Sequence, residues 1–202
     1  LKNHGIQEEI DDMWKMSEWF FSQDREEKLK LLRSEQIPLG FFDRELTKQK
    51  RDLKEVFDFM ETRLESDINQ WPEEAVFKRT MENFFLKSSQ VAEKTLELIL
   101  ICLGLTKNEK VFGDSRTSNA RLNYYPTEDP LNLNEKNEVN KLGDMALHHH
   151  TDPGILTLLL QDMTGGLQAK SKEFGWIDIE PEKDSIVESF SGSISILSLI
   201  HI

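Results

Sequence analysis

The chain has 202 residues, enough for one domain with a substantial core, and its 25 Lys and Arg against 37 Asp and Glu give a formal net charge of −12. This acidic balance argues against nucleic acid as a partner, since sequence-independent binding needs clustered cations to neutralise phosphates. No apolar run is long enough to span a bilayer, so we expect no membrane partner.

The first part of the sequence carries mainly helical patterns. Apolar residues recur at helical spacing from Glu8 to Phe21 behind an acidic start, which predicts an amphipathic helix. Residues 26–34 continue in the same way until Ile37-Pro38-Leu39-Gly40 breaks the pattern. Mixed charges from Arg44 to Arg63 predict a loop followed by a partly exposed helix.

A long central helix is predicted from Pro72 to Gly104. Proline is tolerated in a first turn, and the carboxylates of Glu73 and Glu74 suit the positive end of the helix dipole. An apolar stripe follows over several turns before Gly104 ends the helix. Cys102, the only cysteine, lies in this stripe, so we expect a buried thiol, no internal disulfide and a reducing compartment, the cytoplasm.

After Lys110 the apolar period changes from helical to alternating, and turn residues become dense. This pattern predicts short strands at residues 121–126, 147–150, 157–161, 167–170 and 176–180. Helices followed by strands predict an α+β fold whose sheets close into a sandwich or jelly roll.

The segment His148-His149-His150-Thr151-Asp152 carries the main chemical signal. In a strand, the side chains of His150 and Asp152 share a face with Cα atoms about 6.6–7 Å apart, so both can reach one ion. An imidazole with a carboxylate favours Fe(II), Mn(II) or Zn(II), whereas the alternative interpretation is a polar surface turn. Four residues of strand span about 13 Å, so His148 cannot share an ion with Asp152, and we interpret His148 and His149 as surface or supporting groups.

Several further motifs occur in a fixed order along the chain as far as Val187. They are Asn3-His4-Gly5-Ile6, Phe20-Phe21, Asp52-Leu53-Lys54-Glu55, Asn69-Gln70-Trp71-Pro72, Leu103-Gly104-Leu105, Asn123-Tyr124-Tyr125-Pro126, His150-Thr151-Asp152, Leu156-Thr157-Leu158-Leu159-Leu160-Gln161-Asp162 and Gly166-Leu167-Gln168. This arrangement resembles the iron- and 2-oxoglutarate-dependent dioxygenase superfamily of the isopenicillin N synthase type, which includes the plant flavonoid and gibberellin oxidases. Such co-linearity is more specific than any single motif.

The resemblance implies a mostly helical N-terminal region, residues 1–110, packed on a double-stranded β-helix, or jelly roll, that begins at residue 111. It implies an enzyme with Fe(II) as cofactor and 2-oxoglutarate as co-substrate, in which His150 and Asp152 are two legs of a facial triad of metal ligands. The reaction would oxidise a small organic substrate with O2 and convert 2-oxoglutarate to succinate. Asn123 and Tyr125 match positions that contact the co-substrate, and strand packing explains them equally well.

The sequence departs from the family pattern after Val187. The family places a second His roughly 55 residues after His-x-Asp, then an Arg-x-Ser whose guanidinium holds the distal carboxylate of 2-oxoglutarate. Neither stands at its expected place here, since His201 comes early and Arg116-Thr117-Ser118 lies before the metal motif. We therefore interpret residues 111–187 as a partial jelly roll with missing or altered C-terminal strands, and residues 188–202 as a divergent tail.

These departures, together with Leu1 in place of an initiator Met, predict a fragment that is incomplete at both ends and inactive as it stands. The alternative is a non-catalytic binding or regulatory module that keeps the fold without the chemistry. The sequence leaves the substrate, the type of oxidation and the oligomeric state open.

Overall fold

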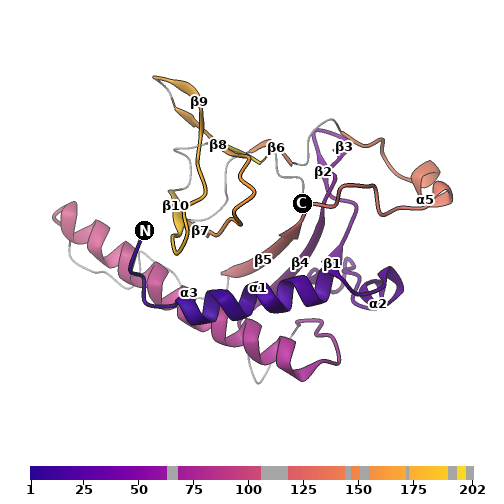
Figure 1. Ribbon diagram of the computed structural model, residues 1–202, viewed down its shortest axis with the longest axis horizontal. Coiled ribbons are helices and arrows are strands. Elements are labelled where there is room, and N and C mark those ends of the chain that lie inside the picture. Colours follow the sequence, from indigo (N-terminus) through magenta and orange to yellow (C-terminus); the bar gives the residue numbers. More distant parts are fainter. Residues whose placement is uncertain are drawn as a thin grey trace.

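The computed structural model describes residues 1–62, 68–105, 118–143, 155–171 and 173–189 with their side chains, and the backbone alone of residues 147–150, 190 and 195–198. The two long helices form one layer, and most of the strands lie above them (Figure 1). The described chain therefore has the mixed helix and strand content that the sequence predicts.

The helical layer consists mainly of α1 (Gln7–Phe21) and α3 (Ala75–Cys102), which pack along each other (Figure 1). Both predicted helices are thereby confirmed. The backbone N–H of Val76 donates to the Glu74 carboxylate at the start of α3, and Gly104 follows its end with φ +70°. The short α2 (Arg25–Leu29) ends before the predicted residue 34, because the chain turns there to bond with β1 (Gly40–Phe42).

An antiparallel sheet in the order β1-β4-β5 covers the helices. Its other strands are β4 (Glu55–Met60) and β5 (Asn119–Tyr124), while β2 (Leu46–Thr47) and β3 (Lys50–Arg51) form a separate hairpin. β4 precedes the long helix α3 in the sequence and β5 follows it, so this sheet joins the N-terminal region to the second half of the chain.

The prediction of a loop and partly exposed helix from Arg44 to Arg63 is wrong. This segment contains β2, β3 and β4, and β4 is the central strand of its sheet. Residues 55–59 are all buried, including Glu55 and Asp58, which form ion pairs with side chains from other segments. The mixed charges of this segment therefore reflect buried ion pairs, although the sequence pattern suggested a solvated helix face.

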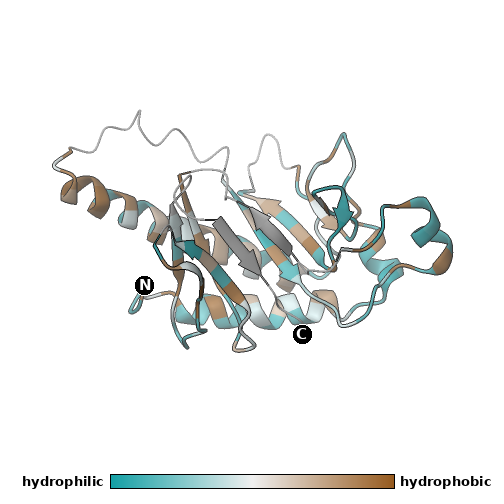
Figure 2. Cartoon of the chain, turned by 90° about the horizontal axis from the view of Figure 1, so that it is seen from above, coloured by the Kyte–Doolittle hydropathy of each residue, from teal (hydrophilic) through white to brown (hydrophobic). Residues whose placement is uncertain are grey.

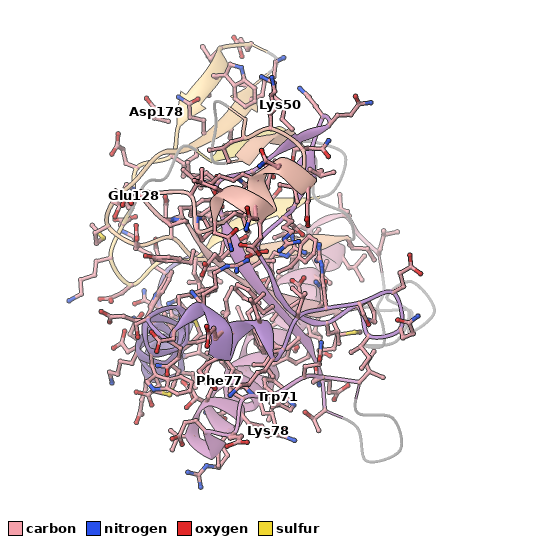
Figure 3. The ribbon with its side chains drawn as sticks, turned by 90° about the vertical axis from the view of Figure 1, so that its right-hand side faces the viewer. Lys50, Trp71, Phe77, Lys78, Glu128 and Asp178 are labelled. Atoms are coloured by element: carbon pink, nitrogen blue, oxygen red, sulfur yellow. The ribbon has the colours of Figure 1, made fainter. Side chains whose placement is uncertain are left out.

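The main apolar core lies between this sheet and the helices α1 and α3. Trp71 packs beside Phe77 with ring centroids 6.2 Å apart, and the ammonium of Lys78 lies 5.8 Å from the Trp71 ring, as the labelled side chains show (Figure 3). The buried members of this core are Met13, Phe20, Phe21, Phe41, Phe57, Phe59, Phe77, Met81, Phe85 and Leu122. Aromatic rings dominate the set, and their tilted and edge-on contacts fix the sheet on the helices.

The second half of the chain is built mainly of short strands, as predicted. They are β6 (Leu147–His150), β7 (Leu156–Leu159), β8 (Leu167–Ser171), β9 (Gly175–Asp178), β10 (Val187–Phe190) and β11 (Ser195–Ser198), and the short helix α5 (Leu133–Glu138) precedes them. They form two sheets, in the orders β6-β11-β8-β9 and β10-β7.

Part of the tail that the sequence marks as divergent contributes to both of these sheets. The backbone of β10 pairs with β7, and β11 lies between β6 and β8, antiparallel to each. Among the described strands, β5 pairs with β4 alone and β7 pairs with β10 alone. Each of these two strands therefore has one edge without a described partner.

The long helix α3 supports the sheet β1-β4-β5 through the main core and the pair β10-β7 through its second half. Its second half packs against β7, and the Thr95 hydroxyl donates to the Glu188 carboxylate of β10 at 2.8 Å. Beyond this contact the helix projects from the body, and its apolar end is exposed (Figure 2). Cys102 lies there and is exposed, so the prediction of a buried thiol is wrong. No helix among the described residues is long and apolar enough to cross a membrane.

Candidate functional site

β6 brings the predicted metal-binding histidine to the end of a strand. His150 is the last residue of β6, and its backbone pairs with Ile196 in β11. The side chain of His150 and all of Asp152 lie outside the described residues, and so do the side chains of His148 and His149. Within the described part of the chain, no group of three or more His, Cys, Asp and Glu could hold a metal ion.

β5 places Asn123 on the face of its sheet that points away from the helices. On the helical face, Leu122 lies in the core, and the ring of Tyr124 stacks on Phe21 with centroids 5.2 Å apart. Because side chains alternate along a strand, Asn123 lies on the opposite face, where it is exposed. Tyr125 follows the end of β5 and is only 6% exposed. Asn123 is thus accessible to a ligand, and the co-substrate roles of Asn123 and Tyr125 stay predictions.

An arginine and a carboxylate lie directly opposite each other on the same face as Asn123. In the register of β4 and β5, Asp58 pairs with Arg121. Arg121 donates from Nε to Asp58 Oδ1 at 2.6 Å and from Nη2 to Oδ2 at 2.8 Å. This two-pronged arrangement matches a planar guanidinium to a carboxylate and is among the stronger kinds of hydrogen bonding in proteins. The Asp58 side chain is 4% exposed, so the pair is largely shielded from water on its acidic side.

Arg33 and Glu45 complete a closed ring of ion pairs with this couple. Arg121 Nη1 donates to Glu45 Oε2 at 2.9 Å, and Arg33 donates to Glu45 Oε1 at 3.0 Å and to Asp58 Oδ2 at 3.1 Å. Each arginine therefore binds both carboxylates. We call Arg33, Glu45, Asp58 and Arg121 the ion-pair ring. It ties the segment after α2 and the segment before β2 to strands β4 and β5.

The surroundings of the ring favour its charged state. Burial alone would raise the pKa of Glu45, but the positive charges of Lys54, Arg121 and Arg33 lower that pKa to about 2. Burial alone would lower the pKa of Arg121, but its hydrogen bonds to Asp58 and Glu45 raise it above the usual value. The Arg33 guanidinium also lies over the phenyl group of Phe42, 3.9 Å from the centroid of that group, and this cation–π contact favours the charged guanidinium.

A second buried ion pair lies on the helical face of the same sheet. Lys28 of α2 donates to Glu55 of β4 at 2.6 Å and to the carbonyl of Phe21 at 3.0 Å. The two side chains are 6% and 3% exposed. Burial raises the pKa of Glu55, and the hydrogen bond from Lys28 opposes that rise. This pair anchors α2 beneath the central strand and has no access to a ligand.

The residues of the ion-pair ring escaped the sequence analysis. Glu45 and Asp58 lie in the segment that was predicted to be loop and exposed helix, where alternating acidic and basic residues suggested solvent contact. A usable signal existed at Asp58, since it stands between Phe57 and Phe59 in a run of apolar residues too short for a helix. A charge in such a position indicates a buried strand that carries an ion pair.

Two family models match the chain on either side of α3. The N-terminal model of the non-haem dioxygenases in morphine synthesis matches residues 1–74, and the model of the 2OG-Fe(II) oxygenase superfamily matches residues 116–198. The chain belongs to the 2OG-Fe(II) oxygenase superfamily. The second match includes β10 and β11, and it extends beyond Val187, where the shared motifs end.

Curated relatives and solved structures agree with this assignment. The chain is 29% identical to the protein DOWNY MILDEW RESISTANCE 6 of Arabidopsis thaliana over 97% of this chain and 56% of that protein, and 28% identical to gibberellin 3-beta-dioxygenase 4 of the same plant over 98% and 57%. Its fold matches a full-length protein of Neurospora crassa in complex with alpha-KG, with a TM-score of 0.82 and 26% identity over 98% of this chain and 68% of that one. The chain spans about half to three fifths of the length of the curated relatives it matches.

The family uses Fe(II) as its metal and 2-oxoglutarate as its co-substrate, and one solved structure of similar fold, that of JOX2, contains both 2OG and Fe. The donor types available in this chain suit that metal, because an imidazole and a carboxylate on one side of Fe(II) leave coordination positions open on the other. The accessible amide of Asn123 suits a dicarboxylate, since it can donate hydrogen bonds to oxygen. The chemistry of the residues present is therefore compatible with both groups.

Proposed function

We propose that this chain belongs to an oxygenase that oxidises a small organic substrate with O2 while it converts 2-oxoglutarate to succinate and CO2. The observation that carries the proposal is the match of both family models in their order, with His150-Thr151-Asp152 inside the second match. Bound Fe(II) would supply the activation of O2 in this chemistry.

The proposal assigns specific tasks to four residues of the chain. His150 and Asp152 would hold the metal as two of its three protein ligands. Asn123 would donate from its side-chain amide to an oxygen of 2-oxoglutarate, and Tyr125 would donate from its hydroxyl. Support for Asn123 comes from its exposure on the outer face of β5, whereas Tyr125 is proposed from its place in the motif Asn123-Tyr124-Tyr125-Pro126 alone.

We also propose that catalysis needs residues in addition to these 202. The sequence supplies two of the three ligands that the family uses, and it has no Arg-x-Ser after the metal motif. The edges of β5 and β7 that lack a described partner offer places where a further strand can pair. On this proposal, the 202-residue chain binds iron and 2-oxoglutarate poorly.

The test compares two lengths of the protein. Succinate formation from 2-oxoglutarate is measured with and without Fe(II) for residues 1–202 and for a form extended with the downstream sequence of the parent transcript. We expect iron-dependent succinate from the extended form and little from the shorter one. Absence of succinate from both forms, with both shown to be folded, would contradict the enzymatic proposal.

The alternative function is a non-catalytic binding or regulatory module. The observation in its favour is the lack of a third metal ligand and of a carboxylate-binding arginine at the family's positions. The downstream sequence distinguishes the two functions, because a further His and an Arg-x-Ser there favour the enzyme. We propose the cytoplasm as the location of either form, since the sole Cys102 fits a reducing compartment.

A further inference from the structure

We propose that Arg121 is a positioning residue for the co-substrate site, because the ion-pair ring fixes β5 immediately before Asn123 and Tyr125. This inference rests on the proposed function, which assigns those two residues to 2-oxoglutarate. Arg121 itself is not assigned any contact with the reacting molecules.

The spacing along β5 links Arg121 to Asn123. Arg121 and Asn123 are two residues apart on one strand, so their side chains lie on the same face with Cα atoms about 6.6–7 Å apart. Asp58 and Val56 stand opposite them in β4. Any rotation or slip of β5 at Arg121 therefore changes the direction of the Asn123 side chain as well.

Contacts on one edge and on both faces hold β5 in place. Its only described neighbour in the sheet is β4, so backbone hydrogen bonds secure one edge. On the helical face, Leu122 is buried in the core and Tyr124 stacks on Phe21. On the opposite face, the described bonds that hold the strand are those of Arg121 to Asp58 and Glu45. The ion-pair ring thus restrains β5 on the same face of the sheet that carries the Asn123 side chain.

The hydrogen bonds made by Arg121 require a guanidinium group. The guanidinium of Arg121 bonds two carboxylates that come from separate segments, and each carboxylate is bonded again by Arg33. A lysine at this position keeps the charge but presents a single compact donor group, so it cannot reproduce the two-pronged bond to Asp58 together with the bond to Glu45. Arg121→Lys should therefore loosen β5 while the protein stays folded.

The first test measures amide hydrogen exchange in residues 1–202. Arg121→Lys and Glu45→Gln should speed exchange of the β5 amides by about tenfold relative to the wild type, because local opening of the strand becomes easier. The matched control is Arg25→Lys, since Arg25 also bridges two carboxylates, Asp43 at 2.6 Å and Glu135 at 2.9 Å, but lies far from Asn123 in the sequence. Exchange in β5 that is the same in Arg121→Lys and the wild type would overturn the proposal.

The second test measures steady-state kinetics in the form of the protein that produces succinate. Arg121→Lys should raise KM for 2-oxoglutarate about five- to tenfold and leave kcat within about twofold, whereas Arg25→Lys should leave both unchanged. A KM equal to the wild type overturns the positioning role even if the variant is less stable. Wild-type protein without any turnover contradicts the proposed function instead, a result that the succinate assay reports separately.

Discussion

The ammonium of Lys28 lies 2.6 Å from the carboxylate of Glu55, with both side chains buried between α2 and the central strand β4. Removing two charges from water is costly, and a buried pair recovers that cost only when both partners are present. Lys28 also donates to the carbonyl of Phe21, the last residue of α1. The pair therefore links both N-terminal helices to the sheet.

Loss of one partner of this pair should destabilise the fold strongly. Lys28→Met leaves the Glu55 carboxylate buried without its cation, and we expect the free energy of unfolding to fall by about 3–5 kcal/mol. The measurement is urea unfolding at neutral pH. The double variant Lys28→Met/Glu55→Leu should recover most of this loss, because it removes both charges. A single variant as stable as the wild type would show that the pair is not buried in solution.

The folded protein should lose stability in acid through Glu45. Its pKa is about 2 in the folded chain against an ordinary value of 4.5, so its contribution is complete above pH 4.5 and is lost as the pH falls from 4.5 to about 2. The full contribution is about 3 kcal/mol. Glu45→Gln should be less stable than the wild type at pH 7, and the gap should narrow towards pH 2.

The control for this acid effect is the exposed Glu73. Glu73→Gln removes one carboxylate outside the ion-pair ring and is the reference against which the gap of Glu45→Gln is measured. A gap between Glu45→Gln and Glu73→Gln that stays constant from pH 7 to pH 2 would contradict a carboxylate held in its charged form by the ion-pair ring.

The thiol of Cys102 should react in the native protein. It lies exposed near the end of α3 and is the only cysteine of the chain. A thiol reagent should therefore modify one group per chain without denaturant, at a rate close to that of the unfolded protein. Cys102→Ser should abolish the signal. Reaction only after unfolding would mean that this end of α3 is covered in solution.

Much of the fold could be predicted from the sequence where one face of an element meets water. α1 shows this, since Ile10, Met13 and Phe20 recur at helical spacing between polar residues and are buried in the structure. The strands after Lys110 are likewise bounded by turn residues such as Gly165 and Gly166, both with positive φ. In such segments, local pattern and tertiary environment agree.

The prediction failed where charged residues are buried and where apolar residues are exposed. β4 is buried on both faces. Its Glu55 pairs with Lys28 of α2, and its Asp58 pairs with Arg33, which follows α2, and with Arg121 of β5, so the partners are distant in sequence. At Cys102 the error is the reverse, because an apolar stripe suggested burial whereas the end of α3 projects from the body. Neither outcome depends on local sequence, so periodicity could not reveal it.

The candidate site could be proposed from the sequence because its residues form short motifs along the chain. His150 and Asp152 are separated by one residue, and so are Asn123 and Tyr125, so an extended backbone would group each pair, and these assignments stay predictions. The ion-pair ring is assembled from separate segments, and only the structure brings its members together. This difference explains why the ring beside Asn123 was missed.

The central claim is that His150 and Asp152 bind the iron that supports 2-oxoglutarate turnover. The most direct measurement is iron-dependent succinate formation by the extended form of the protein, compared among single alanine variants of His148, His149, His150 and Asp152. We predict a loss of at least about 100-fold for His150→Ala and Asp152→Ala, and activity within about threefold of the wild type for His148→Ala and His149→Ala. Full activity of His150→Ala or Asp152→Ala would contradict the claim.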